Sequence, residues 1–405
     1  MDAGEAGKAM IQRLAAVAIA CIAMMNAQVP VSRPPVEIAW DLVAKGKSVE
    51  AVALLQETVK KDPRNADVRL LLGSILMEAG ERNESIAQLT EAVRLRPKSA
   101  EAQNALGEAY DHFGEPKLAR PAFERAVAID PAFGQARVNL AAVLLQAGEG
   151  ERAAEHLERA IVLLGDKPDA AYPRYLRAKL YVARRNTAKA VADLEKAVAL
   201  RPDFGEAWSD LGEARKTLLD DEGAFQAYRR AVELSPDDSV AQTRLGLNLL
   251  NRGKPHEAIG PLQEAARLDP NNQSTLNALQ LALRKDGQRE QADAVKRRLA
   301  EVLRDKDQAD QKLVSALEMN NKGSELEKGG DVRGALERYH AALELYPDHA
   351  GIRTNYAVAL LKLGRWEEGI AQMRESLRRD PQNAELKKAL DDALAQAKAH
   401  GLVQR

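Results

Sequence analysis

The hydrophobic pattern between Ala100 and Pro131 predicts two amphipathic helices of about four turns each, joined by a tight turn at Gly114. Small and apolar residues recur at helical spacing in both halves of this stretch. They are Leu106, Gly107 and Tyr110 in the first half, and Ala119, Phe123 and Ala126 in the second. Glycine fits the left-handed conformation in which helices commonly end, and proline cannot donate the hydrogen bond that would continue a helix. The stretch is therefore expected to form helix, turn, helix and stop.

This pattern recurs along most of the chain. Glycine marks the turn and proline marks the end of the second helix, both with a period of 34 residues. Both series show the same two insertions, one of 3 residues at 164–168 and one of 9 residues before Gly330. The turn glycines are Gly46, Gly80, Gly114, Gly148, Gly253, Gly287, Gly330 and Gly364, and the prolines are Pro63, Pro97, Pro131, Pro168, Pro202, Pro236, Pro270, Pro347 and Pro381. Because two residue types agree, the helix pair is the repeating unit.

A second set of glycines falls inside the predicted first helices. These are Gly73, Gly107, Gly212, Gly246 and Gly323. Glycine in a helix interior costs about 1 kcal/mol relative to alanine. A cost repeated at one register predicts a compensating close contact with a neighbouring helix, so Gly107→Leu is expected to be destabilising by overpacking.

Over 34 residues the order of leucine-glycine, an aromatic, alanine, an aromatic, alanine and proline resembles the tetratricopeptide repeat. The fullest match is formed by Trp208, Leu211, Gly212, Ala224, Tyr228, Ala231 and Pro236. We identify ten repeats, which start near residues 32, 66, 100, 134, 171, 205, 239, 273, 316 and 350. The repeat from 273 lacks its proline, and the repeat from 171 lacks its turn glycine. The resemblance implies an all-α fold, a right-handed α-solenoid of about ten helix-turn-helix repeats with a C-terminal capping helix.

The predicted repeats also set the domain organisation. We expect a repeat array at 36–304 with eight repeats, a charged helical insertion at 305–315, two further repeats at 316–383, and a capping helix and tail at 384–405. The stretch from 288 to 321 has no glycine or proline and keeps helical spacing, which predicts one lengthened helix. Its charged part is expected to be a solvated extension, with a hinge or a dimer contact as the alternatives.

Composition limits the partners more than it limits the fold. The 405 residues carry 59 basic and 60 acidic side chains, a formal net charge of −1, which gives no case for a nucleic acid or an anionic surface as partner. In a repeat protein each repeat contacts only its neighbours, so length does not predict several globular domains. One helix pair has too little apolar surface to offset the entropy of ordering it, so stability must come from stacking.

Residues 1–27 differ in kind from the repeats. An uncharged apolar run from Leu14 to Met25 follows basic residues and is too short to span a bilayer. This pattern predicts a signal peptide with cleavage after Ala27, followed by a proline-rich linker at 28–35. The protein is therefore expected to be exported, to the periplasm or cell envelope, or to remain cytoplasmic if the leader is not functional.

The only cysteine, Cys21, lies in this leader. The residues before it resemble a bacterial lipoprotein processing site, except that Ala18 stands where leucine is typical. Either Cys21 is one more apolar residue of a leader that is removed, or it carries a lipid anchor. In both cases the exported chain has no disulfide, and its stability rests on packing.

The sequence offers no set of residues typical of a catalytic centre. The six histidines are scattered without metal-ligand spacing, and there is no phosphate-binding loop, dinucleotide fingerprint or nucleophile elbow. We therefore predict no catalytic residues, no metal, no cofactor and no enzymatic activity. Tetratricopeptide arrays also occur as arms of enzymes, but here the repeats fill the chain.

The resemblance implies a groove, because in such arrays the first helices line a concave face that contacts extended peptides or partner helices. The positions that face outward there become the candidate binding residues of this chain. They are Asn104, Glu108, His112, Gln135, Asn139, Tyr172, Tyr175, Lys179, Glu213, Thr243, Asn251 and Asn277. Asn139 falls at the sixth position of its repeat, where asparagines of some arrays bond a peptide backbone. Tyr172 and Tyr175 could equally pack at the irregular junction or bind a partner.

The function that these observations favour is a non-enzymatic protein-protein interaction scaffold that holds peptides or proteins in a concave groove. One alternative is a structural subunit of a cell-envelope complex that uses the convex face or the insertion. The other is an accessory arm of an enzyme on another chain. The expected partners are proteins or peptides, with no nucleic acid and no membrane beyond a leader or lipid anchor, and the chain is expected to be a monomer or a weak homodimer.

Overall fold

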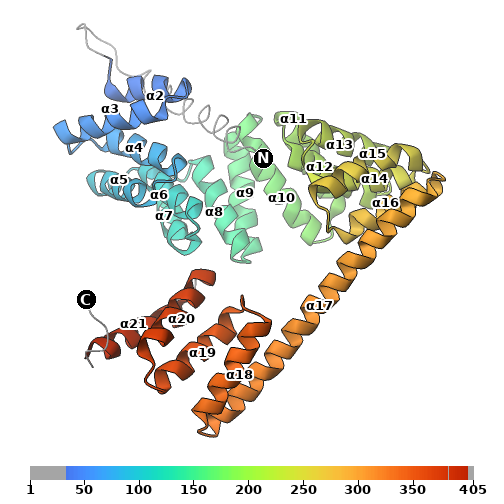
Figure 1. Cartoon of the computed structure of the whole chain (residues 1–405). Coiled ribbons are helices and arrows are strands. Elements are labelled where there is room, and N and C mark those ends of the chain that lie inside the picture. Colours follow the sequence, from blue (N-terminus) through green and yellow to red (C-terminus); the bar gives the residue numbers. More distant parts are fainter. Residues whose placement is uncertain (1–32, 382, 400–405) are drawn as a thin grey trace. The chain divides into compact units, whose positions relative to one another are not determined.

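The computed structural model describes residues 33–381 and 383–399, and these residues form 20 α-helices and one short 3-10 helix, η1 (Figure 1). The helices are α2 (Pro35–Ala44), α3 (Ser48–Lys61), α4 (Ala66–Glu78), α5 (Arg82–Leu95), α6 (Ala100–His112), α7 (Pro116–Ile129), α8 (Gly134–Gln146), α9 (Gly150–Leu164), η1 (Pro168–Ala170), α10 (Ala171–Ala183), α11 (Thr187–Leu200), α12 (Gly205–Thr217), α13 (Asp221–Leu234), α14 (Ser239–Asn251), α15 (Pro255–Leu268), α16 (Gln273–Lys285), α17 (Arg289–Lys328), α18 (Val332–Leu345), α19 (Ala350–Lys362), α20 (Trp366–Arg379) and α21 (Ala384–Ala399). The expected leader at 1–27 and Cys21 lie outside the described residues.

Consecutive helices form pairs, and the predicted all-α repeat fold is confirmed. We refer to the first helix of each pair as the A helix and to the second as the B helix. From α4 to α16 every A helix begins at the residue where a repeat was expected to start. Within α2 to α16, and again within α17 to α21, each helix packs on the next one along the chain, as α6, α7 and α8 illustrate. The core is thus a series of interfaces between sequence neighbours.

The turn glycines have the conformation that the sequence predicts. All eight adopt positive φ angles, from 72° at Gly253 to 89° at Gly330. A β-carbon is disfavoured in this left-handed region, so glycine there ends the A helix without strain. Two pairs lack the glycine, and their turns place Arg185 (φ 56°) and Leu219 (φ 63°) in the same region.

The glycines inside the A helices make the close contacts that their register predicts. A β-carbon built on Gly107 would lie 2.6 Å from two ring carbons of Phe123, sixteen residues later on the B helix. The same clash would occur between Gly212 and Tyr228, at 2.5 Å. Each of these glycines therefore lets a large B-helix side chain lie directly against the A-helix backbone.

A further contact links five of the A helices to the turn before them. The fourth residue of five A helices donates a side-chain hydrogen bond to the carbonyl oxygen of the proline six residues earlier. These donors are Arg69, Arg137, Trp208, Gln242 and Arg353. The indole Nε1 of Trp208, for example, lies 3.0 Å from the Pro202 oxygen. The repeating proline thus ends one pair and also provides an acceptor that fixes the entry of the next.

The two insertions have different structures. The insertion of 3 residues follows α9 and forms η1, after Gly165 has adopted a positive φ of 63°. The insertion of 9 residues lies in α17, a single helix of 40 residues. Along α17 the residues 303–312 are all exposed, whereas Leu299 and Ala316 on either side are buried.

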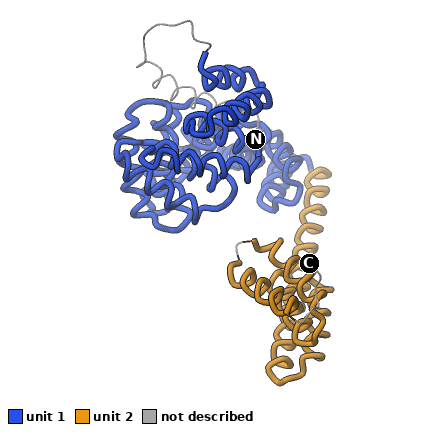
Figure 2. The backbone as a smooth tube through the Cα atoms, turned by 90° about the vertical axis from the view of Figure 1, so that its left-hand side faces the viewer, with its two compact units in different colours: residues 1–288 blue, residues 289–405 orange. Residues whose placement is uncertain are grey.

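The chain divides into two compact units, residues 1–288 and 289–405, which are coloured separately in Figure 2. In unit 1 the largest buried cluster extends from Ala119 on α7 to Ala227 on α13. In unit 2, α21 packs on α20 and buries Leu386 and Leu390 against residues that include Met373. The helix α21 is the capping helix that the repeat pattern predicts.

Candidate partner-binding surface

All twelve candidate binding residues lie on A helices of unit 1, from α6 to α16. Within this set of helices, α6 packs on α8, α12 on α14, and α14 on α16, while α10 packs mainly on α9 and α11. The side chains nevertheless differ widely in exposure. The exposed ones are His112, Lys179, Asn251 and Asn277, the partly buried ones are Glu108, Gln135, Asn139, Tyr172 and Glu213, and the buried ones are Asn104, Tyr175 and Thr243.

Four of the candidates form one hydrogen-bond network between α6 and α8. The Nδ2 of Asn139 donates to Asn104 Oδ1 (3.0 Å) and to Glu108 Oε1 (2.9 Å). Asn104 Nδ2 also donates to Glu108 Oε1 (2.9 Å), and Gln135 Nε2 donates to Asn139 Oδ1 (3.0 Å). The network fixes the orientation of every member, and Glu108 Oε2 accepts no hydrogen bond from the part of the chain that the structure describes.

The surroundings of Glu108 disfavour the negative charge of its carboxyl group. Burial raises the pKa of Glu108, and the nearby carboxylate of Glu78 on α4 raises it further, while the hydrogen bonds from Asn139 and Asn104 oppose the shift. Burial also raises the pKa of Asp111, one turn further along α6. Negative charge at this place is therefore poorly solvated, and a cation brought by a partner would stabilise it.

The two candidate tyrosines lie on α10 and contact Phe204, which precedes α12. The ring centroids of Tyr175 and Phe204 are 4.9 Å apart, and those of Tyr172 and Tyr175 are 6.3 Å apart. Tyr175 is only 7% exposed, and burial followed by the charges of Asp210 and Glu206 raises the pKa of its hydroxyl, so it stays protonated. Tyr175 therefore serves packing, and Tyr172 is the aromatic that a partner can reach.

Phe204 was not among the predicted site residues. It stands directly before its A helix, as Phe133 stands before α8 two repeats earlier. Because phenylalanine precedes the A helix in both repeats, Phe204 could have been identified from the sequence.

The remaining candidates do not extend one continuous binding strip. Thr243 is 9% exposed, and its hydroxyl oxygen lies 2.7 Å from that of Thr275, so this pair ties α14 to α16. Glu213 accepts a hydrogen bond from the buried Tyr228 hydroxyl (2.8 Å). Burial alone would raise the pKa of Glu213, but this bond and the ammonium of Lys216 hold it below its ordinary value. The structure thus brings together the candidates on α6 and α8 in one network, places the two tyrosines of α10 in an aromatic cluster with Phe204, and leaves the others separate.

Comparison with known proteins gives the family. Models described as tetratricopeptide repeat match residues 42–110, 112–180, 175–239 and 320–384, which together make up more than half of the chain. This chain belongs to the tetratricopeptide repeat family. Proteins of this family are in general non-catalytic repeat scaffolds, and the repeats of this chain support a general role in interactions between proteins.

Individual tetratricopeptide relatives are distant. The chain is 36% identical over 84 residues to the heat-shock protein cognate co-chaperone sgt12 of Aspergillus fumigatus, and this match spans 20% of the chain and 25% of the length of that relative. Among solved structures, it is similar to Pseudomonas aeruginosa pilF with 19% identity, a TM-score of 0.49, and coverage of 53% of this chain and 98% of that one. A tetratricopeptide repeat protein of Parabacteroides merdae gives 17% identity, a TM-score of 0.45, and coverage of 62% and 97%.

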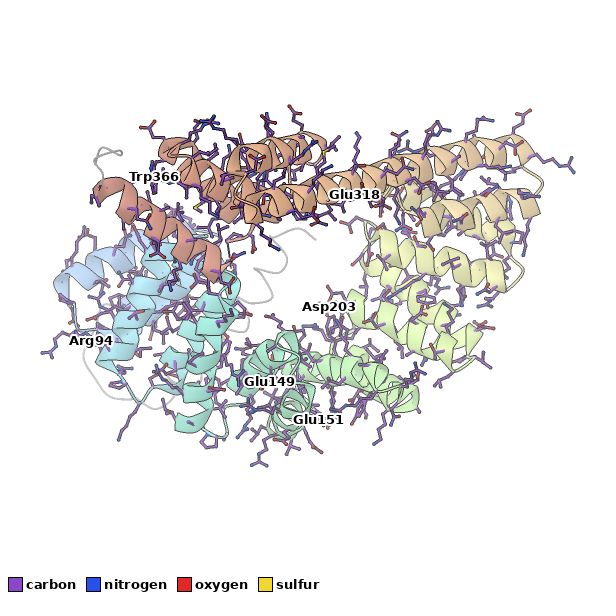
Figure 3. All side chains as sticks on the ribbon, turned by 90° about the horizontal axis from the view of Figure 1, so that it is seen from below. Arg94, Glu149, Glu151, Asp203, Glu318 and Trp366 are labelled. Atoms are coloured by element: carbon purple, nitrogen blue, oxygen red, sulfur yellow. The ribbon has the colours of Figure 1, made fainter. Side chains whose placement is uncertain are left out.

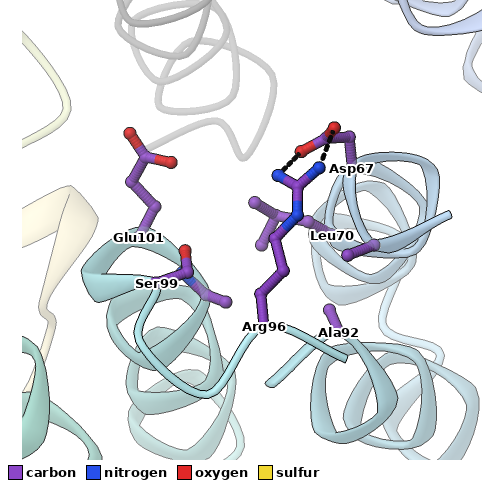
Figure 4. A pocket seen from close by; sticks show the side chains of 8 residues that line it. Asp67, Leu70, Ala92, Arg96, Ser99 and Glu101 are labelled. Carbon is purple, nitrogen blue, oxygen red and sulfur yellow. Dashed lines mark hydrogen bonds and ion pairs between the residues drawn. The ribbon is translucent and has the colours of Figure 1, made fainter. Parts of the chain in front are cut away.

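One small pocket of this tetratricopeptide chain lies between α4 and α6, where Arg96 reaches across to Asp67 (Figure 4). The Nη2 of Arg96 lies 2.7 Å from Asp67 Oδ2, and the pocket has a volume of about 10 Å³. Such a volume holds one water molecule at most, so the pocket is not a small-molecule site.

Within 33–381 and 383–399, no group of three or more His, Cys, Asp or Glu side chains is placed to hold a metal ion. None of the helices in these ranges is both long and apolar enough to cross a lipid bilayer.

Proposed function

We propose that this tetratricopeptide scaffold binds an extended peptide segment across the A helices α6, α8 and α10. The main support is the polar network between α6 and α8, in which amides hold Glu108 and leave one carboxylate oxygen open to a donor. Fixed polar groups of this kind recognise a partner with little loss of side-chain entropy. The network therefore suits a peptide better than a flexible charged surface would.

The side chains of Glu108 and Tyr172 suggest which residues the peptide would carry. A lysine or arginine side chain would meet Glu108, whose negative charge is raised in free energy by burial. An apolar side chain would meet Tyr172, which is partly exposed and stacks on Tyr175.

The test is selection of short peptides from a random display library, followed by fluorescence polarisation with the selected peptides. We expect them to carry a basic residue and an apolar residue. Glu108→Gln should weaken their binding about tenfold, because a charge-assisted hydrogen bond becomes a neutral one. Tyr172→Ala should weaken binding to a similar extent.

The matched control is Arg229→Ala, which removes an exposed charge from the B helix α13. This variant should bind the peptides as wild type does. Peptides without a basic residue, or equal losses in the control and in the two groove variants, would rule out binding at this network. If the losses occurred in the control alone, contact through the B-helix layer would be favoured instead.

The site of action is a separate proposal. The leader pattern of residues 1–27 supports export, so the peptide partner would be met outside the cytoplasm. Determination of the amino terminus of the protein purified from its natural source tests this, and cleavage after Ala27 is the expected result.

A further inference from the structure

The turns after α10 and α12 depart from the rest of the array. Among the described residues, Arg185 and Leu219 are the non-glycine residues with positive φ, and they occupy the same turn in consecutive pairs. A β-carbon makes this conformation unfavourable, and glycine avoids the strain at the corresponding turn of eight other repeats. Strain of this kind persists where the side chain has another use, so these two side chains need an explanation.

The same turns expose apolar side chains. Leu219 is 87% exposed, and Val182 and Leu218 are about half exposed, at 53% and 48%. Leu219 thus combines an unfavourable backbone conformation with almost complete contact with water. Glycine at this position would remove both penalties.

Ion pairs tie the turns on either side of these two to their neighbours. On the side toward the N-terminus, Arg184 forms an ion pair with Glu151 at 2.7 Å, and Figure 3 labels Glu151. On the other side, Arg252 pairs with Glu222 at 2.6 Å. Between them, Arg185 and Asp221 have no ion-pair partner in the described part of the chain. We call Val182, Arg185, Leu218, Leu219 and Asp221 the turn edge.

We propose that the turn edge is a self-association surface, on which a second copy of this chain docks about a two-fold axis. Val182 and Arg185 lie at the end of α10, whereas Leu218 and Leu219 follow α12 and Asp221 begins α13 (Figure 1 locates these helices). A two-fold rotation that places the first turn of one copy on the second turn of the other brings Arg185 to Asp221 at two equivalent places. Leu218 and Leu219 of each copy then face Val182 of the other copy.

Other occupants fit the turn edge less well. An acidic segment would meet Asp220 and Asp221 directly after Leu219. An anionic membrane surface is recognised by clusters of about four to eight basic residues, and here Arg185 is the one basic side chain without an acidic partner. Since the surface is small, association should be weak, with a dissociation constant on the order of 10 µM or above.

Sedimentation velocity of the full chain over a micromolar concentration series tests the proposal. Wild type should show concentration-dependent dimerisation in fast exchange. Leu219→Gly should weaken dimerisation about tenfold while raising resistance to denaturant, because it removes apolar contact and backbone strain together. The control Leu118→Ser, which changes an exposed leucine on α7, should dimerise as wild type does.

A mixing experiment tests the two-fold geometry itself. Arg185→Glu alone and Asp221→Arg alone should each weaken self-association about tenfold, because each places like charges together. An equimolar mixture of the two variants should dimerise again, since both contacts in the mixed dimer are then between opposite charges. A wild-type chain that stays monomeric at every concentration, or a mixture that stays monomeric, overturns the proposal. Binding of wild type to phosphatidylglycerol vesicles that is lost in Arg185→Glu also overturns it, in favour of a membrane contact.

Discussion

Replacement of Gly107 by alanine tests the main packing principle of this fold. Alanine is the better helix former, and propensity alone would make the variant about 1 kcal/mol more stable. The structure predicts the opposite result, because the new β-carbon would lie 2.6 Å from both Cδ1 and Cε1 of Phe123. Real β-carbons essentially never approach so closely, so the ring or the helix must move.

The magnitude follows from how firmly Phe123 is held. Its side chain is 1% exposed and belongs to the largest buried cluster of unit 1, so the ring has no open space to enter. Overpacking in a filled core typically costs about 1–3 kcal/mol. Because the ring is fully buried, the upper part of this range, about 2–3 kcal/mol, applies. After the gain of about 1 kcal/mol in propensity, Gly107→Ala should lose about 1–2 kcal/mol, and Gly107→Leu should lose several kcal/mol.

Hydrogen exchange measured by mass spectrometry on peptides from α6 and α7 is the appropriate assay, since long repeat arrays need not unfold in one step. The free energy of opening of α6 and α7 should be about 1–2 kcal/mol lower in Gly107→Ala than in wild type. In a Phe123→Leu background, which shortens the facing side chain, the same alanine should be much less harmful. If Gly107→Ala protects these peptides as well as wild type or better, the close contact does not control packing and the reasoning is wrong.

Four further predictions concern stability and cleavage. Leu219→Gly should stabilise its helix pair by about 1–2 kcal/mol in denaturant unfolding, because a β-carbon in the left-handed region costs that amount; an unchanged midpoint would contradict the strain. The folded-state pKa of Glu108 is raised, so its protonated form favours folding and this contribution is lost as pH rises through that pKa. Glu108→Gln should therefore be more stable than wild type at pH 7 and equal to it in acid. The pKa of Glu213 is lowered, so Glu213→Gln should be less stable than wild type at pH 7, and this difference should fade as the pH falls below about 4.5. If the stability of Glu108→Gln and that of Glu213→Gln depended on pH in the same way, the opposite pKa shifts would be refuted. Trypsin should cut first within 303–312, where an exposed helix has basic residues and no covering contacts; initial cleavage elsewhere would show that this helix is protected.

The fold could be predicted from the sequence because its rules are local and repeat. Gly114 allows the backbone conformation of the turn, and Pro131 lacks the hydrogen-bond donor that would continue the second helix. Neither effect depends on distant residues. Gly107 stands at a position where several other first helices also have glycine. That repetition predicted a close contact with the second helix, which the structure has between Gly107 and Phe123. Ten copies of a weak signal gave a firm assignment of the A and B helices.

The candidate site was less predictable, because a position in a repeat does not determine burial. Asn104, Tyr175 and Thr243 were expected to face a groove, and they are buried between neighbouring helices. Their burial depends on the side chains that happen to stand on the next pair, such as Phe204 and Thr275, and the repeat pattern leaves those free to vary. The network around Glu108 needs two consecutive A helices at once, so no single repeat could indicate it.

The contacts between sequence neighbours also determine how a bound partner would be detected. Since each helix pair is held chiefly by the pairs on either side, different stretches of the array can open and close without the rest. A ligand then slows amide exchange mainly in the pairs that it spans and in their immediate neighbours. An exchange map of the protein with and without a ligand would therefore outline where that ligand lies, pair by pair, before any complex is crystallised.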